Sequence, residues 1–112
     1  MLLVRETYQS CFDVAVKCAL ECEHCANECP SEATMAECAR LCRDCADICW
    51  QAAAFMSRGS RFIPHLVRSC IDICEACADT CEQHDIEHCQ KCAQACRRTA
   101  DDFRKIIRVA AL

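Results

Sequence analysis

The chain is poor in residues that break helices, since its 112 residues include one glycine and two prolines. Secreted domains held together by disulfides are usually rich in loops, with turns between their cysteines. The scarcity of glycine and proline argues against such a scaffold and favours long helices.

Long apolar runs and basic patches are absent as well. No stretch approaches the roughly 20 apolar residues that span a bilayer, so we expect no membrane association. Residues 1–6 lack the pattern of a signal peptide, which predicts a cytoplasmic protein with reduced thiols. The 13 basic and 17 acidic residues are dispersed along the chain, so we expect no nucleic-acid partner.

Motifs for catalysis are missing too. The sequence shows no Ser-His-Asp set, no paired catalytic carboxylates and no phosphate-binding loop. We therefore expect a protein that is not an enzyme.

Cysteine is abundant, with 16 residues in the chain. Such a fraction is typical of disulfide scaffolds and metal–thiolate proteins. The other apolar residues are few for a core of this length, so something besides ordinary packing must stabilise the interior. The length predicts one domain, residues 1–112.

The first two helices are bounded by the few breakers. The first is predicted over residues 3–29, because Pro30 stops it. Thr34 and Glu37 form a capping box for the second, which is predicted to end near residue 58. Gly59 follows, where a left-handed residue can close the helix.

The last two helices follow the same logic. Ser60 can cap a third helix that ends near residue 83, with Pro64 tolerated in its first turn. Asp85 can cap a fourth, which runs to about residue 109. The short connections make neighbours antiparallel. The predicted fold class is therefore all-α, an antiparallel up-down four-helix bundle with a cysteine-lined core.

The cysteines support this division. From Cys18 onward their spacing within each helix alternates between four and three, which places them on one helical face. The full set is Cys11, Cys18, Cys22, Cys25, Cys29, Cys38, Cys42, Cys45, Cys49, Cys70, Cys74, Cys77, Cys81, Cys89, Cys92 and Cys96.

Antiparallel topology predicts that these side chains stack in layers across the bundle. The expected sulfur layers are Cys29/Cys38/Cys81/Cys89, Cys25/Cys42/Cys77/Cys92, Cys22/Cys45/Cys74/Cys96 and Cys18/Cys49/Cys70/Thr99. Beyond these layers the inward-facing seam of the helices, which carries the cysteines, becomes apolar. Its layers there are Ala15/Ala52/Val67/Phe103 and Cys11/Met56/Ile63/Ile106. The pattern predicts a sulfur-lined tube with an apolar plug at one end.

The chemistry of the thiols favours several Cu(I) ions per chain. Cu(I) is soft and selects thiolate, and two thiols at i and i+4 lie close enough to share a two-coordinate ion. Tetrahedral zinc suits sulfurs in a line along a helix less well, and iron–sulfur loop motifs are absent. A zinc or general soft-metal buffer, and less so an iron–sulfur or thiol redox protein, remain alternative hypotheses.

Three residues lie near the expected mouth of the tube, at the turns between the first and second and between the third and fourth helices. Met35, His84 and His88 are candidate ligands for copper uptake, although each also fits an ordinary core or surface role. Cys11 lies in the apolar plug and is interpreted either as a metal ligand or as a structural thiol. His24 is expected to be solvated.

The cysteine blocks, the segment Asp44-Cys45-Ala46-Asp47-Ile48-Cys49-Trp50 and the turn Arg58-Gly59-Ser60 resemble the bacterial copper storage proteins, in particular their cytosolic branch. The resemblance covers essentially the whole chain. It implies a homotetramer of four-helix bundles that stores Cu(I) inside each bundle, for copper homeostasis or detoxification. Thr99 departs from the pattern, because family members often carry further cysteines in the last helix.

Overall fold

The structure, a computed structural model, describes residues 8–30 and 33–109. It contains four helices: α1 (Gln9–Glu28), α2 (Ala33–Ser57), α3 (Ile63–Cys81) and α4 (Glu87–Val109). No strand occurs in these two ranges. The all-α prediction is confirmed, while residues 3–7 of the predicted first helix lie outside the described part of the chain.

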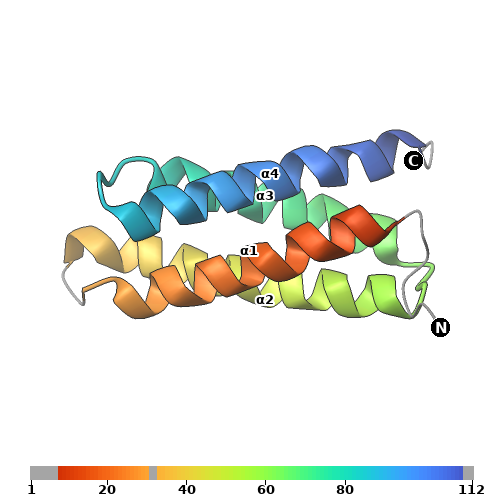
Figure 1. The fold of residues 1–112 in the computed structure, drawn as a ribbon, viewed down its shortest axis with the longest axis horizontal. Coiled ribbons are helices and arrows are strands. Elements are labelled where there is room, and N and C mark those ends of the chain that lie inside the picture. Colours follow the sequence, from red (N-terminus) through yellow and green to blue (C-terminus); the bar gives the residue numbers. More distant parts are fainter. Residues whose placement is uncertain (1–7, 31–32, 110–112) are drawn as a thin grey trace.

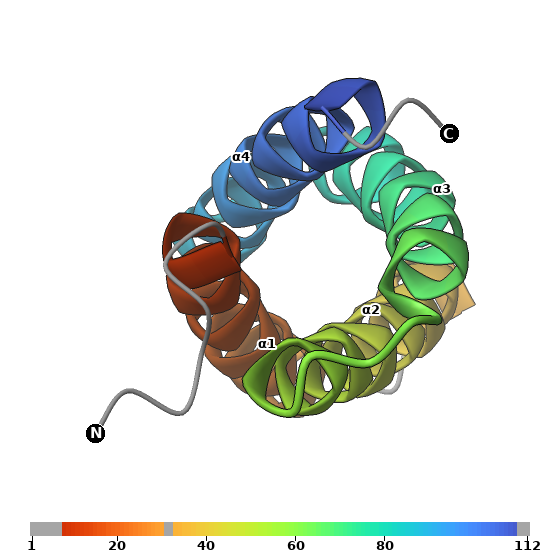
Figure 2. The same ribbon diagram turned by 90° about the vertical axis from the view of Figure 1, so that its right-hand side faces the viewer.

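The four helices run alternately up and down and pack side by side along a bundle of 43 × 27 × 19 Å (Figure 1). Viewed along its axis, each helix lies next to its two neighbours in a ring (Figure 2). The up-down topology is therefore confirmed. We call the end with the α1–α2 and α3–α4 connections the sulfur end, and the end with the α2–α3 connection the apolar end.

Two helix ends form as the breakers predict. Cys29 follows α1 with an extended ψ of 127°, because a residue before proline is disfavoured in the helical region. Gly59 closes α2 with a φ of 63°. Its N–H bonds to the Met56 carbonyl and that of Ser60 to the Phe55 carbonyl, which is the Schellman arrangement.

The three predicted N-terminal caps are wrong by one or two positions, counted from the residue that directly precedes each helix. Thr34 lies inside the first turn of α2, because the helix already begins at Ala33. Ser60 lies three residues before the start of α3. Its side chain accepts a hydrogen bond from the Phe62 N–H at 3.1 Å and so closes the preceding turn. Asp85 precedes the start of α4 by two residues. Several polar residues stand near each end, and packing decides where the helix begins.

The apolar end holds the bulky part of the core. Phe103, Met56 and Val67 have no exposed surface, and Ile63 and Ile106 close the same region. The predicted plug is confirmed. No helix in the described ranges is long and apolar enough to cross a membrane.

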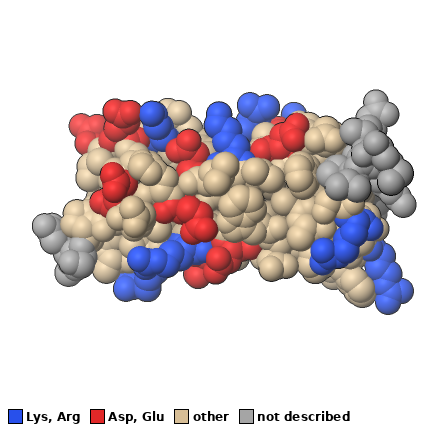
Figure 3. All heavy atoms as spheres, turned by 60° about the horizontal axis from the view of Figure 1, so that its bottom comes forward, with Lys and Arg blue, Asp and Glu red and all other residues tan. Residues whose placement is uncertain are grey.

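Charged side chains are distributed unevenly along the surface. On the face drawn in Figure 3, acidic and basic side chains are mixed over the left half, the middle and the upper right, and the lower right corner shows only basic ones among its charged groups. Left in this view is the sulfur end, as in Figure 1. The sequence also places no acidic residue between Asp47 and Asp72, the stretch that forms the α2–α3 turn at the apolar end.

Candidate metal centre

The cysteine side chains point into the bundle. Fourteen of the sixteen have no exposed surface, and the other two are the buried Cys11 and the partly exposed Cys29. Because successive cysteines on a helix are alternately four and three residues apart, they all lie on the face that the helix turns toward its neighbours. All sixteen thiols are free.

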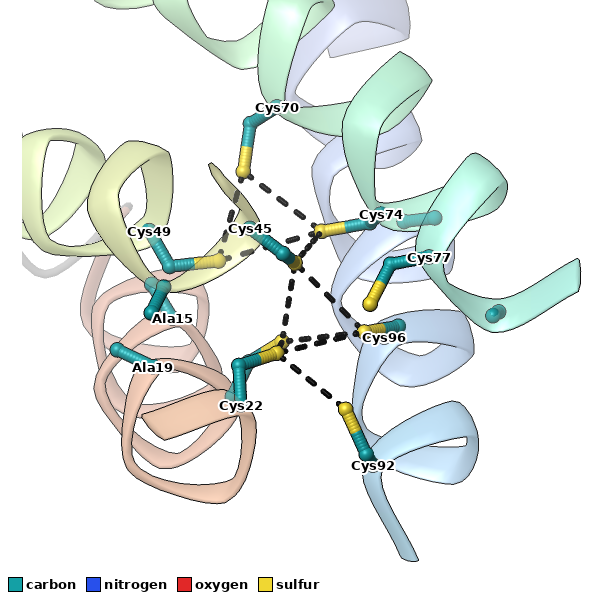
Figure 4. Close-up of a cluster of buried hydrophobic side chains, with 14 of the residues drawn as sticks. Ala15, Ala19, Cys22, Cys45, Cys49, Cys70, Cys74, Cys77, Cys92 and Cys96 are labelled. Carbon is teal, nitrogen blue, oxygen red and sulfur yellow. Dashed lines mark hydrogen bonds between the residues drawn. The ribbon is translucent and has the colours of Figure 1, made fainter. Parts of the chain in front are cut away.

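The centre of the network joins sulfurs from all four helices (Figure 4). Cys45 Sγ of α2 lies 3.5 Å from Cys74 Sγ of α3 and 3.6 Å from Cys96 Sγ of α4. Cys22 Sγ of α1 lies 3.7 Å from Cys96 Sγ. The contacts confirm the predicted layer that contains these four cysteines.

Toward the sulfur end the layers interleave. Cys81 Sγ lies 3.4 Å from Cys38 Sγ of the same predicted layer and 3.7 Å from Cys42 Sγ of the next. Cys42 Sγ also lies 3.7 Å from Cys92 Sγ. Because side chains of packed helices insert between those of the facing helix, the discrete layers become one continuous array.

The array contains four sets of four thiols whose sulfurs all lie within 4.8 Å of one another. The sets are Cys18/Cys45/Cys49/Cys74, Cys18/Cys22/Cys45/Cys96, Cys22/Cys77/Cys92/Cys96 and Cys25/Cys42/Cys81/Cys92. Each set shares at least one sulfur with another, so ions placed along the tube would be linked by common ligands.

Neighbours four residues apart on one helix are close, but they do not make the shortest contacts. The sulfurs of Cys18 and Cys22 are 3.9 Å apart, and those of Cys70 and Cys74 are 3.8 Å apart. Contacts between helices are as short as 3.4 Å. The i, i+4 pairs stressed by the sequence pattern are therefore one part of a three-dimensional network.

Thr99 ends the sulfur array. Cys49 and Cys70 of its layer are in contact at 3.7 Å, whereas the fully buried Thr99 brings a hydroxyl. That hydroxyl donates to the carbonyl of Ala95 at 2.9 Å and lies 3.4 Å from the carbonyl of Val14. The hydroxyl is thus hydrogen-bonded to the backbone, and Thr99 offers no thiol to a metal.

Cys11 lies apart from the other thiols. Its Sγ donates to the backbone carbonyl of Asp102 at 3.5 Å. Burial, followed by the nearby Asp102 carboxylate, raises the pKa of this thiol to about 11. The sequence pattern gave no sign that Asp102 is buried, because aspartate on a helix is usually solvated. Its carboxylate bonds to Ser10, Arg98 and Lys105.

Of the three candidate uptake residues, His88 is placed against the thiols. Its Nδ1 lies 3.2 Å from Cys25 Sγ and 3.6 Å from Cys89 Sγ, and together with Cys29 these residues form a mixed group within 4.8 Å.

The other two candidates are placed differently. Met35 is buried in the core, and His84 is half-buried with its carbonyl bonded to Gln90 at 2.8 Å. Among the described residues, neither side chain bonds to a thiol.

Burial limits the number of thiolates that the array can hold without a cation. In the described ranges the buried polar residues are Thr99 and Asp102, and no basic side chain is buried. Hydrogen bonds from Cys42 and also from Cys92 and His88 lower the pKa of Cys25 to about 5. Burial, followed by the charge of Cys25, raises the pKa of Cys89 to about 12. Cys25 is thus more acidic than an ordinary cysteine, whereas Cys89 keeps its proton unless a positive charge lies nearby.

The sequence matches the family model of the copper storage proteins over residues 4–108. The chain belongs to this family. Among solved structures it resembles the Cu(I)-bound copper storage protein BsCsp3 of Bacillus subtilis, with 38% identity over 89% of this chain and 97% of that one and a TM-score of 0.85.

A second relative is a cytosolic copper storage protein from Streptomyces lividans, solved with five coppers. It has 34% identity over 92% of this chain and 93% of that one, with a TM-score of 0.85. Another structure of the Streptomyces protein is loaded with 10 copper equivalents. No curated protein matches the sequence. Members of the family thus share the helical frame described above.

Proposed function

We propose that this protein stores many Cu(I) ions as cargo inside its bundle. The observation that carries the proposal is a continuous array of buried thiols from all four helices with no basic side chain buried among them in the described ranges. An unpaired buried thiolate is costly. One monovalent ion for each thiolate leaves the core neutral, and shared sulfurs can give each Cu(I) two or three ligands.

Fifteen cysteines make up the proposed storage set, which is every cysteine except Cys11. His88 is the proposed uptake ligand, supported by its contacts with Cys25 and Cys89. Ligand roles for Met35 and His84 stay predictions from the sequence. The whole chain would act as one storage domain.

Zinc is the second candidate cargo. Four thiols within 4.8 Å of one another also fit a tetrahedral Zn(II) site, so helical spacing by itself argues only weakly against zinc. Charge favours copper, because a separate Zn(II) site with four thiolates carries two negative charges in a buried position. The ratio of metal to thiol separates the two cargoes.

The cellular compartment and the oligomeric state are inferred from the family. The Streptomyces relative is described as cytosolic, and we infer the same compartment for this chain and a storage role without catalysis. A homotetramer is the expected assembly, and sedimentation velocity of the apo and loaded protein would measure it.

The test is an anaerobic titration of reduced protein with Cu(I) against a chromophoric chelator, with thiols counted in parallel. We expect uptake approaching roughly one copper per clustered cysteine and much tighter binding than that of zinc. Saturation after one or two ions would indicate a carrier of single ions. A preference for zinc, with few metals per thiol, would establish the zinc buffer instead.

A further inference from the structure

The connection between α2 and α3 carries a basic and aromatic surface at the apolar end of the bundle (Figures 1 and 2). The sequence has no acidic residue between Asp47 and Asp72. The exposed side chains in and near the connection include three arginines and one phenylalanine. We call these four residues the basic tip: Arg58, Arg61, Phe62 and Arg68.

The arginines of the basic tip form no ion pair with a carboxylate of the described ranges. Arg97 of α4, by contrast, pairs with three carboxylates across the α3–α4 interface. One corner of the surface at the apolar end likewise shows only basic side chains among its charged groups (Figure 3). The positive charge of the tip is therefore available to an external anion.

Two guanidinium groups in this region are stacked on aromatic rings. Cζ of Arg58 lies 4.6 Å from the centroid of the Phe55 ring, and Cζ of Arg61 lies 4.8 Å from that of Phe62. One N–H of Arg58 donates to the Ala54 carbonyl at 3.2 Å. Stacking fixes the flat faces of the guanidinium groups and leaves their other N–H groups for oxygen atoms of phosphate or carboxylate.

Phe62 adds an apolar contact to this charge. It keeps 49% of its surface exposed, although Arg61 and His65 pack against its ring. Aromatic rings beside basic side chains are typical of protein surfaces that lie in the interface of a bilayer. The backbone of a nucleic-acid duplex offers phosphates to the arginines but no apolar contact to this ring. The combination therefore favours a lipid surface.

The shape and charge of the bundle favour an end-on contact. The molecule is 43 Å long, its net charge is −4, and acidic side chains are common away from the tip (Figure 3). Repulsion from an anionic surface is therefore least when the basic tip points toward it. The sulfur end then faces the solvent, where metal exchange is unhindered.

We propose that the basic tip binds the anionic headgroups of a lipid surface, with its arginines on phosphate groups and Phe62 in the headgroup layer. The lack of a membrane-spanning segment does not bear on a peripheral contact of this kind. The inference goes beyond the storage function and does not depend on it.

The experiment is co-sedimentation of the reduced full-length protein with lipid vesicles. One set of vesicles is an equal mixture of phosphatidylglycerol and phosphatidylcholine, and the other is phosphatidylcholine alone. We expect binding to the anionic vesicles that weakens as salt is raised, because salt screens the attraction. Binding to the neutral vesicles should be weak at every salt concentration.

Two variants test the residues, each with a matched control. Arg61→Gln should weaken binding to the anionic vesicles about fivefold, the scale for one basic residue at such a surface. Arg43→Gln removes the same charge from an exposed position of α2 outside the tip and should bind like the wild type. Phe62→Ser should weaken binding by a similar factor, whereas Leu20→Ser, at an exposed position of α1, should not.

Equal binding of Arg61→Gln and Arg43→Gln would overturn the proposal, and so would equal binding of the wild type to both sets of vesicles or no binding to the anionic set. Tighter binding to a DNA duplex than to the vesicles, with the same dependence on Arg61, would assign the tip to nucleic acid instead. The copper titration is a separate measurement, so a failure of the storage function is distinguishable from a failure of this proposal.

Discussion

The two ends of this bundle use the same helices and the same inward-facing seam for different purposes. Toward the sulfur end the seam carries small thiols such as Cys45 and Cys74, which touch at 3.5 Å. Toward the apolar end it carries Phe103, Met56 and Val67, all fully buried. Stability and function are thus separated along the axis of one core.

The separation has an energetic reason. Burial of a large apolar side chain contributes roughly 1.5–3 kcal/mol, and side chains of this kind are concentrated at the apolar end. A thiol buries little area and gains most when a metal binds it. The apolar end therefore holds the helices together before copper arrives, and the sulfur end is free to take up metal.

The largest effect on stability is expected at the apolar end. Replacing Phe103 by alanine should lower the free energy of unfolding of the apo protein by about 3–5 kcal/mol, since a large cavity is left. Urea unfolding of the reduced protein measures the loss. A cost as small as that of a sulfur-end substitution would show that the two ends contribute equally.

The matched change at the sulfur end is Cys45→Ala, which removes one buried sulfur. We expect it to lower the free energy of unfolding of the apo protein by about 1 kcal/mol. Because Cys45 belongs to two of the four-thiol sets, copper capacity should fall by roughly one or two ions. Unchanged stoichiometry in the chelator titration would remove this residue from the storage set.

The boundary between the two ends can be moved at Thr99. Thr99→Cys places a fourth thiol beside Cys18, Cys49 and Cys70, and we expect a gain of about one copper per chain. Thr99→Val is the control, because it keeps the shape without adding sulfur. Equal capacity in both variants would mean that something other than the missing thiol ends the array.

The effect of Cys11 is absent at neutral pH and appears only at high pH. Its pKa is raised from the ordinary 9.0 to about 11, so the folded protein keeps a proton that the unfolded chain loses. The stability from this group is complete below pH 9.0 and is lost as pH rises toward about 11.

Urea unfolding across this interval tests the effect. As pH rises, the free energy of unfolding of the wild type should fall relative to that of Cys11→Ala. Copper capacity should stay the same in both proteins, because Cys11 lies outside the array. A lower capacity in Cys11→Ala would place this thiol among the ligands.

Much of the fold could be read from local sequence. Pro30 and Gly59 mark helix ends because each restricts or permits particular backbone angles at its own position. The alternation of four and three residues between cysteines assigns each of them to one face without reference to any other helix. The helix starts were less predictable, since Thr34, Ser60 and Asp85 are only some of several polar residues near each end.

The sequence by itself therefore determined four helices, their antiparallel order, a seam of inward-facing thiols and the apolar plug. The tertiary structure decided which sulfurs meet, such as Cys38 with Cys81, and that Cys11 bonds to a backbone carbonyl away from the array. It also decided that His24 faces His88. The physical reason is that periodicity acts within one helix, whereas the stagger between helices depends on how the side chains of all four pack at once.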